Sequence, residues 1–199
     1  MRVDDLGEAR GQLLELLRTL SFAEREVTLV SGRKSNFYVD CKQVTLHAAG
    51  HVLLGHLLLG EIHAYQARTG RIVGGVGGLT LGADPIASAV AYTSALKDTP
   101  IPAFIVRKEA KGHGTGAYLE GMSNVPDGAE VCVVEDVVTT GGSALKAVER
   151  VRAAGFPVNL VLGIVDRLEG GREAVEAAGL ELVTLYTRRD FMPDERVRS

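Results

Sequence analysis

Hydrophobic residues recur with a helical period at the start of this chain. In residues 6–20 the leucines lie at helical spacing, which predicts an N-terminal helix. Residues 26–40 are rich in β-branched and aromatic residues on either side of Gly32, so we expect two short strands joined by a turn. A second helix is expected from Thr45, as its N-cap, to about residue 66.

From residue 71 onward, short apolar runs alternate with helical patterns. Strands are predicted at residues 71–76, 102–106, 130–134, 158–166 and 181–187. Helices are predicted at residues 143–155 and 171–179, and another opens at Asp84-Pro85, with Asp84 as N-cap and Pro85 in the first turn. This alternation indicates crossover units and a parallel sheet with helices on both faces. The predicted fold class is therefore α/β, in one domain of residues 1–199 without internal repeats or linkers.

The composition limits the class of protein and the compartment in which we expect it. With 199 residues, 46% hydrophobic and 24% charged, the chain can bury a sizeable core. The net charge of −3 gives no overall attraction to nucleic acid, so any anion site must be local. Cys41 and Cys132 stand far apart, which disfavours a disulfide framework and favours a reducing compartment. The apolar stretch 51–65 is too short to span a bilayer, so we expect a cytoplasmic protein without a membrane partner.

The most informative segment is residues 133–144, VVEDVVTTGGSA. An apolar strand runs into the carboxylates Glu135 and Asp136 and then into a loop of small residues that opens a helix. This loop can aim N–H groups and hydroxyls at a phosphate on the helix N-terminus, while the carboxylates suit ribose hydroxyls beside it. The pattern predicts a ribose-5-phosphate pocket. The plainer alternative is an acidic strand end with a helix cap, although two carboxylates after an apolar strand need a partner.

Other phosphate-binding patterns fit poorly. The chain has no G-x-x-x-x-G-K-[ST] motif, and Gly75-Val76-Gly77 lacks the third glycine of a dinucleotide fingerprint. A second match, at residues 112–117, is not followed by an apolar helix. Neither alternative class is supported.

The Glu-Asp-x-x-x-Thr-Gly-Gly-Ser element resembles the phosphoribosyl-diphosphate signature of the type I phosphoribosyltransferases. The resemblance implies that Glu135 and Asp136 bind the ribose hydroxyls. It also implies that the loop holds the 5-phosphate, through Val137, Val138, Thr139, Thr140, Gly141, Gly142 and Ser143.

Two further segments resemble the orotate branch of that family. Residues 107–116, RKEAKGHGTG, resemble its mobile catalytic loop, in which Arg107, Lys108, Lys111 and His113 would concentrate positive charge for a departing pyrophosphate. By itself this segment could also be a solvated basic loop. Residues 31–35, SGRKS, with the following aromatic pair resemble the family's N-terminal hood, although alone they indicate only a hairpin turn.

The base-binding residues are also suggested by resemblance. Arg167 matches the family's orotate-contacting arginine, and a planar guanidinium can bind a carboxylate and ring carbonyls through paired hydrogen bonds. Thr139 matches a loop residue that touches the base. The alternative for Arg167 is a structural pair with Asp166 on the surface.

The resemblance covers nearly the whole chain and implies an orotate phosphoribosyltransferase with a small hood at about residues 1–45. It implies Mg²⁺ carried mainly on phosphoribosyl diphosphate without dedicated protein ligands, and a homodimer that shares the basic loop. Lys111, His113 and Asp136 would be the catalytic residues. The chain departs from many members at Val30, where a lysine is common, and at residues 78–85, where many carry a Tyr-Lys pair.

Alternatives remain open at the level of sequence. A phosphoribosyltransferase for another base would be expected to lack the basic loop and the Asp166-Arg167 pair. A regulatory module that senses phosphoribosyl diphosphate would be expected to carry an additional nucleic-acid-binding segment or a damaged loop. His47 and His51 lie four residues apart on a predicted helix, but without a third ligand nearby we expect no metal site there.

Overall fold

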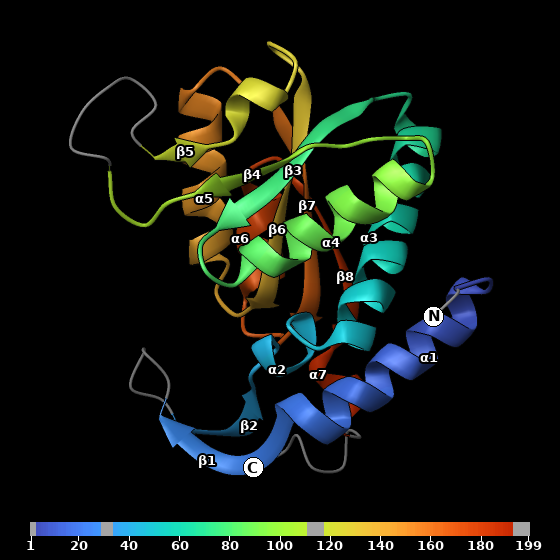
Figure 1. Cartoon of the computed structure of the whole chain (residues 1–199). Helices are drawn as coiled ribbons and strands as arrows, with labels where there is room; N and C mark the ends of the chain where they lie inside the picture. The colour runs from blue at the N-terminus through green and yellow to red at the C-terminus, as the bar shows by residue number, and fades with distance from the viewer. Residues whose placement is uncertain (1–2, 29–33, 111–117, 193–199) are drawn as a thin grey trace.

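A computed structural model describes residues 3–28, 34–110 and 118–192 of the chain (Figure 1). Several predictions fall outside these ranges: the catalytic residues Lys111 and His113, and the hood turn at residues 29–33, which includes Val30. These remain predictions from sequence.

The centre of the molecule is a six-stranded sheet with the order β5-β4-β3-β6-β7-β8. Its strands are β3 (Val73–Leu79), β4 (Ala103–Val106), β5 (Leu119–Glu120), β6 (Glu130–Val138), β7 (Val158–Asp166) and β8 (Glu181–Thr187). All neighbouring strands pair in parallel except β5, which runs antiparallel to β4 at the edge. The predicted parallel sheet is confirmed, with each predicted strand in place.

Helices cover both faces of this sheet (Figure 1). They are α1 (Leu6–Leu16), continued by a π-helical turn η1 (Leu17–Ser21), and α2 (Lys42–Thr45), α3 (Ala48–Thr69), α4 (Ala83–Leu96), η2 (Met122–Asn124), α5 (Gly142–Ala153), α6 (Gly171–Ala177) and α7 (Arg188–Phe191). Along β7, Leu160 and Leu162 join a core with α1, α3 and α4, whereas Val161 joins a core with α5 and α6. Side chains of alternate strand residues point to opposite faces, so β7 is buried on both. Within the described residues, no helix is long and apolar enough to cross a membrane.

Two predicted helix starts were wrong. Thr45 is fully buried and ends the short helix α2, and α3 instead begins after His47. Asp84 lies inside the first turn of α4, whose N-cap is Gly82, and its carboxylate accepts a hydrogen bond of 2.6 Å from Thr80 Oγ1. In neither place does the side chain suited to capping serve as the N-cap.

The hood packs at the end of the sheet where β6, β7 and β8 terminate (Figure 1). It contains an antiparallel hairpin of β1 (Phe22–Thr28) and β2 (Lys34–Val39). The rings of Phe22, Phe37 and Phe191 form a cluster with centroids 5.3 to 5.7 Å apart. Because Phe191 belongs to α7, directly after β8, this cluster holds the N-terminal hairpin against the C-terminal strand.

Candidate active site

The acid pair predicted from sequence lies at the carboxyl end of β6, near the centre of the sheet. In open parallel sheets this is the edge where ligands bind. Glu135 is only 7% exposed, and its Oε2 is buried without a hydrogen-bond partner in the described part of the chain. The carboxylate of Asp136 accepts a hydrogen bond of 2.9 Å from the Val137 backbone N–H. An unsatisfied buried oxygen is costly, which suits a site that completes its bonds with a ligand.

A cavity of about 340 Å³ opens over the acid pair. Besides Glu135 and Asp136, its lining comprises Lys42, Leu79, Thr80, Leu81, Gly82, Lys108 and Ser143. The structure therefore brings together the acid pair, the predicted lysine Lys108 and the last residue of the predicted phosphate loop. Two lysines and two acidic residues thus border one space, as a diphosphate bound beside a sugar would need.

Burial and, to a lesser extent, the charge of Asp136 together raise the pKa of Glu135 to about 8, although Lys108 opposes the shift. Desolvation and a like charge both disfavour the ionised form. At neutral pH the Glu135 carboxyl is therefore largely protonated. A neutral Glu135 can donate a hydrogen bond, while Asp136 can only accept.

The predicted phosphate loop forms a small cup of about 20 Å³ in front of the acid pair. Gly141 is the N-cap of α5 with φ of 80°, a left-handed conformation that favours glycine. A Cβ at Gly171, the first residue of α6, would lie 2.5 Å from the backbone oxygen of Thr139, so α6 packs closely behind the loop. The loop is thus held between two helix starts, and the free N–H groups of α5 point toward the cup.

Arg167 follows β7 and is nearly buried. Its guanidinium pairs with Glu169 at 2.9 Å and lies over the ring of Phe37, 5.6 Å from the centroid. Asp166, by contrast, has an ion pair of 3.4 Å with Arg172. The structure thus places Arg167 under the hood, with Glu169 as an acidic partner.

Arg107 does not line the cavity. Its guanidinium pairs with Glu120 on β5 at 3.1 Å, and its Nε donates to the backbone oxygen of Glu109. The contact between Arg107 and a diphosphate therefore stays a prediction from sequence.

Lys42 and the segment from Thr80 to Gly82 line the cavity but were not assigned from sequence. Lys42 comes from the hood and its Nζ pairs with Asp40 at 2.7 Å. A Cβ at Gly82 would lie 2.7 Å from Oδ1 of Asp136, so this segment lies directly against the acid pair. The sequence differs from many family members at residues 78–85, and this difference could have drawn attention to the segment. No sequence feature pointed to Lys42.

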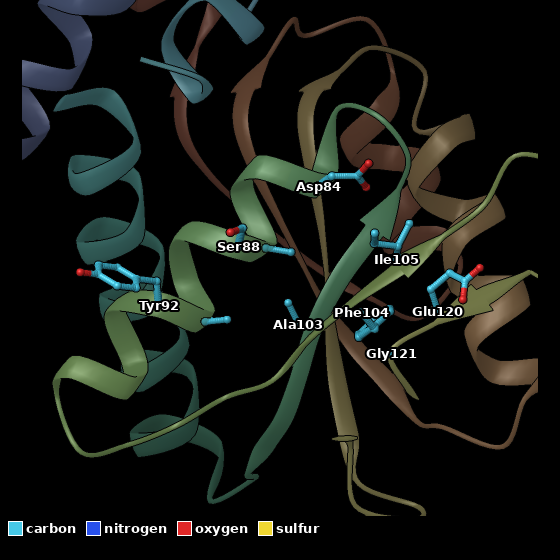
Figure 2. A pocket seen from close by; sticks show the side chains of 10 residues that line it. Asp84, Ser88, Tyr92, Ala103, Phe104, Ile105, Glu120 and Gly121 are labelled. Carbon is cyan, nitrogen blue, oxygen red and sulfur yellow. The ribbon is translucent and has the colours of Figure 1, made fainter. Parts of the chain in front are cut away.

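A second hollow, of about 410 Å³, lies between α4 and the edge strands β4 and β5 (Figure 2). Figure 2 shows Tyr92 of α4 at one side and Glu120 of β5 at the other, with Ala103 and Phe104 between them. Although larger, this hollow is lined by the separated carboxylates Asp84 and Glu120 and by no lysine of the described residues. Its chemistry gives no reason to place the site there.

Curated relatives decide the family. The orotate phosphoribosyltransferase of Sorangium cellulosum is 50% identical over 188 residues, which cover 93% of this chain and 94% of the relative. That of Nostoc is 48% identical, over 94% of this chain and 87% of the relative. The chain belongs to the orotate phosphoribosyltransferase family. No family model matches it.

Solved structures agree with this assignment. The orotate phosphoribosyltransferase of Mycobacterium tuberculosis in complex with Fe(III) dicitrate has a TM-score of 0.78 and 42% identity, covering 92% of this chain and 99% of that one. The same enzyme in complex with 5-phospho-α-D-ribosyl 1-diphosphate has a TM-score of 0.73 and 40% identity, over 92% of this chain and 98% of that one. The predicted type I phosphoribosyltransferase fold is confirmed.

Proposed function

We infer that the protein transfers the 5-phosphoribosyl group from phosphoribosyl diphosphate to orotate, giving orotidine 5′-monophosphate and pyrophosphate in pyrimidine biosynthesis. The carrying observation is the buried acid pair that leads into the loop before α5, in a chain half identical to an orotate phosphoribosyltransferase. This enzyme is a pentosyltransferase. The relatives disfavour the two alternatives, transfer to another base and sensing without catalysis.

The 5-phosphate and the ribose bind on adjacent parts of β6 and α5 in this proposal. The phosphate accepts hydrogen bonds from backbone N–H groups of residues 139–143 at the helix N-terminus. Asp136 accepts a hydrogen bond from one ribose hydroxyl, and a neutral Glu135 donates a hydrogen bond to another. As the bond to the leaving group lengthens, positive charge develops at the anomeric carbon, and the Asp136 carboxylate stabilises it.

Lys42 and Lys108, which both line the 340 Å³ cavity, bind the diphosphate in this proposal. Their ammonium groups neutralise the charge that accumulates on pyrophosphate as it leaves. Lys111 and His113, outside the described residues, are proposed from sequence to join them. Arg107 is proposed to do so only after leaving Glu120.

Mg²⁺ fits this site as an ion carried by the diphosphate. Its preferred ligands are oxygens, and it usually retains water and binds phosphates with one or two carboxylates. Asp136 lines the same cavity and could add one carboxylate oxygen to ligands that come mainly from the diphosphate and water. When bound, the ion supplies positive charge that stabilises the leaving pyrophosphate.

Orotate is proposed to bind between Arg167 and Thr139. The nearly buried guanidinium of Arg167 can hold the orotate carboxylate through two hydrogen bonds. Orotate then attacks the face of the anomeric carbon opposite to the diphosphate. Positioning and electrostatics supply the rate, without a covalent intermediate.

The assembly and location are proposed on the basis of family resemblance. We propose one domain of residues 1–199, a cytoplasmic location and a homodimer whose basic loop enters the neighbouring subunit's site. In such a dimer each site requires residues from two chains.

The test is the loss of orotate's ultraviolet absorbance on addition of phosphoribosyl diphosphate and Mg²⁺. We expect wild-type protein to consume orotate and Lys111→Ala to be much slower. Lys146→Ala, an exposed lysine on the same protein, should match wild type. If the diphosphate binds but orotate is untouched, another base or a sensor role replaces this proposal.

A further inference from the structure

We propose that Arg150 is a positioning residue that fixes Lys108 where it can meet the diphosphate. Helix α5 would set the distance between Lys108 and the cup for the 5-phosphate. This inference rests on the proposed function, because it assigns Lys108 to the leaving group. Arg150 itself does not line the cavity.

Three contacts connect Arg150 with the two ends of the basic segment. Its Nη1 donates to the backbone oxygen of Arg107, and its Nη2 donates to the backbone oxygen of Lys108 at 3.1 Å. Its guanidinium also lies over the ring of Tyr118, 3.9 Å from the centroid. Since the Arg107 backbone N–H donates to the Tyr118 oxygen at 2.7 Å, both ends of the segment meet at this one side chain.

The backbone at Lys108 needs such support because the strand has already ended. Strand β4 stops at Val106, and its edge partner β5 contains only two residues. Beyond that point Arg150 bonds the carbonyls of two successive residues. The guanidinium therefore fixes the backbone from which the Lys108 side chain extends into the cavity.

The same helix begins at the phosphate loop. Ser143, in the first turn of α5, borders the cavity, and Arg150 lies seven residues later. Seven residues of α-helix span about 10 Å in two turns, on nearly the same face. We infer that α5 sets the separation between the 5-phosphate cup and the lysine that meets the diphosphate.

An arginine is required for this arrangement. Its planar fork can donate to two carbonyls while its face stacks on an aromatic ring. A lysine has no planar fork and cannot reproduce all three contacts. Arg150→Lys should therefore retain only part of the affinity of the wild-type protein for the diphosphate.

The helix offers a matched control. Arg152 also reaches from α5 to a backbone carbonyl, that of Val158 at 2.7 Å, but at the start of β7, away from the site. Loss of Arg152 therefore also removes a hydrogen bond from α5 to a backbone carbonyl, but one that is away from the cavity. Only loss of Arg150 should disturb Lys108.

The experiment compares Arg150→Gln with Arg152→Gln and wild type. Calorimetry measures the binding of phosphoribosyl diphosphate with Mg²⁺, and steady-state kinetics give KM for each substrate. We expect Arg150→Gln to weaken diphosphate binding and raise its KM by roughly 10-fold or more, because small displacements of binding groups are costly. The KM for orotate and the unfolding midpoint should stay near those of the Arg152→Gln control.

A double variant tests whether the effect passes through Lys108. In a Lys108→Met background, Arg150→Gln should have little further effect, because the group it positions is already absent. Additive losses, or equal changes in both KM values, would overturn the inference. The calorimetric comparison does not require turnover, so it tests Arg150 even if orotate proves not to be the substrate.

Discussion

Glu135 and Asp136 are neighbours in sequence but differ in environment. Burial and the charge of Asp136 raise the pKa of Glu135 to about 8, whereas Asp136 receives a backbone hydrogen bond from Val137. Two adjacent carboxylates can therefore serve as donor and acceptor to the same sugar. This difference has a measurable consequence for stability.

We expect Glu135→Gln to alter the pH dependence of stability in the ligand-free protein. The folded state keeps a proton on Glu135 that the unfolded state loses above its ordinary pKa of 4.5. Stability from this group is therefore fully present below 4.5 and falls as pH rises to about 8. At about 1.4 kcal/mol per pKa unit, the loss amounts to a few kcal/mol at most.

Urea unfolding of wild type and Glu135→Gln between pH 5 and about pH 9 measures this effect. The free energy of unfolding of the variant should depend less on pH, and its advantage should grow toward pH 9. Parallel profiles for the two proteins would contradict the shifted pKa.

Lys42 supports a second prediction at this scale. It is about half exposed, yet it borders the cavity and is held by Asp40. Lys42→Met keeps the length of the side chain but removes its charge. We expect weaker binding of phosphoribosyl diphosphate with Mg²⁺, by roughly 10- to 150-fold, since charge-assisted bonds contribute about 1.5 to 3 kcal/mol.

Calorimetry with Lys146→Met as the control tests this role. Lys146 is exposed on α5 and does not line the cavity, so its loss should leave affinity unchanged. If the two variants bind the diphosphate equally well, Lys42 is a surface residue paired with Asp40 and no more.

At the scale of elements, the site depends on close approaches between segments from different strands. The turn between β3 and α4 comes so near Asp136 that a Cβ at Gly82 would lie 2.7 Å from its Oδ1. Contacts below 3.0 Å require something to move. Asp136 is less buried than Glu135, so its carboxylate is the group that we expect to shift.

Gly82→Ala should therefore impair catalysis more than stability. We expect kcat/KM for the diphosphate to fall by roughly 10-fold or more, because Asp136 would leave its position beside the ribose. Gly11→Ala, a helical position where a Cβ meets nothing within 4 Å, is the control and should be neutral or slightly stabilising. Equal activity in both variants would show that the turn adjusts without moving Asp136.

At the scale of the whole molecule, residues far apart in the chain meet around one edge of the sheet. The hood contributes Lys42, β4 leads to Lys108, and β6 carries the acid pair. The proposed homodimer would add a loop from a second chain. Such sharing can be tested with inactive variants.

Lys111→Ala and Asp136→Asn should complement each other when mixed and allowed to exchange subunits. In a heterodimer with shared loops, one site would combine an intact acid pair with an intact loop. Random exchange would restore roughly a quarter of the sites. If each loop serves its own subunit, the mixture stays as inactive as its components, so recovered orotate consumption distinguishes the two arrangements.

Much of the architecture could be predicted from local patterns. Strand and helix periods differ, and buried parallel strands appear as apolar runs, so all the predicted strands of the parallel sheet were found. The acid pair and the phosphate loop were also predictable, because they are contiguous and lie where a strand meets a helix. Local chemistry determined these parts by itself.

Only the tertiary structure decided the contacts between distant segments. The predicted N-caps at Thr45 and Asp84 were wrong because packing buries the first and Thr80 bonds the second. Lys42 lines the cavity, and Arg107 pairs with Glu120, because the fold brings these segments together. Periodicity reports which face of an element is buried, but the partner across a cavity depends on how strands are ordered, which no local pattern encodes.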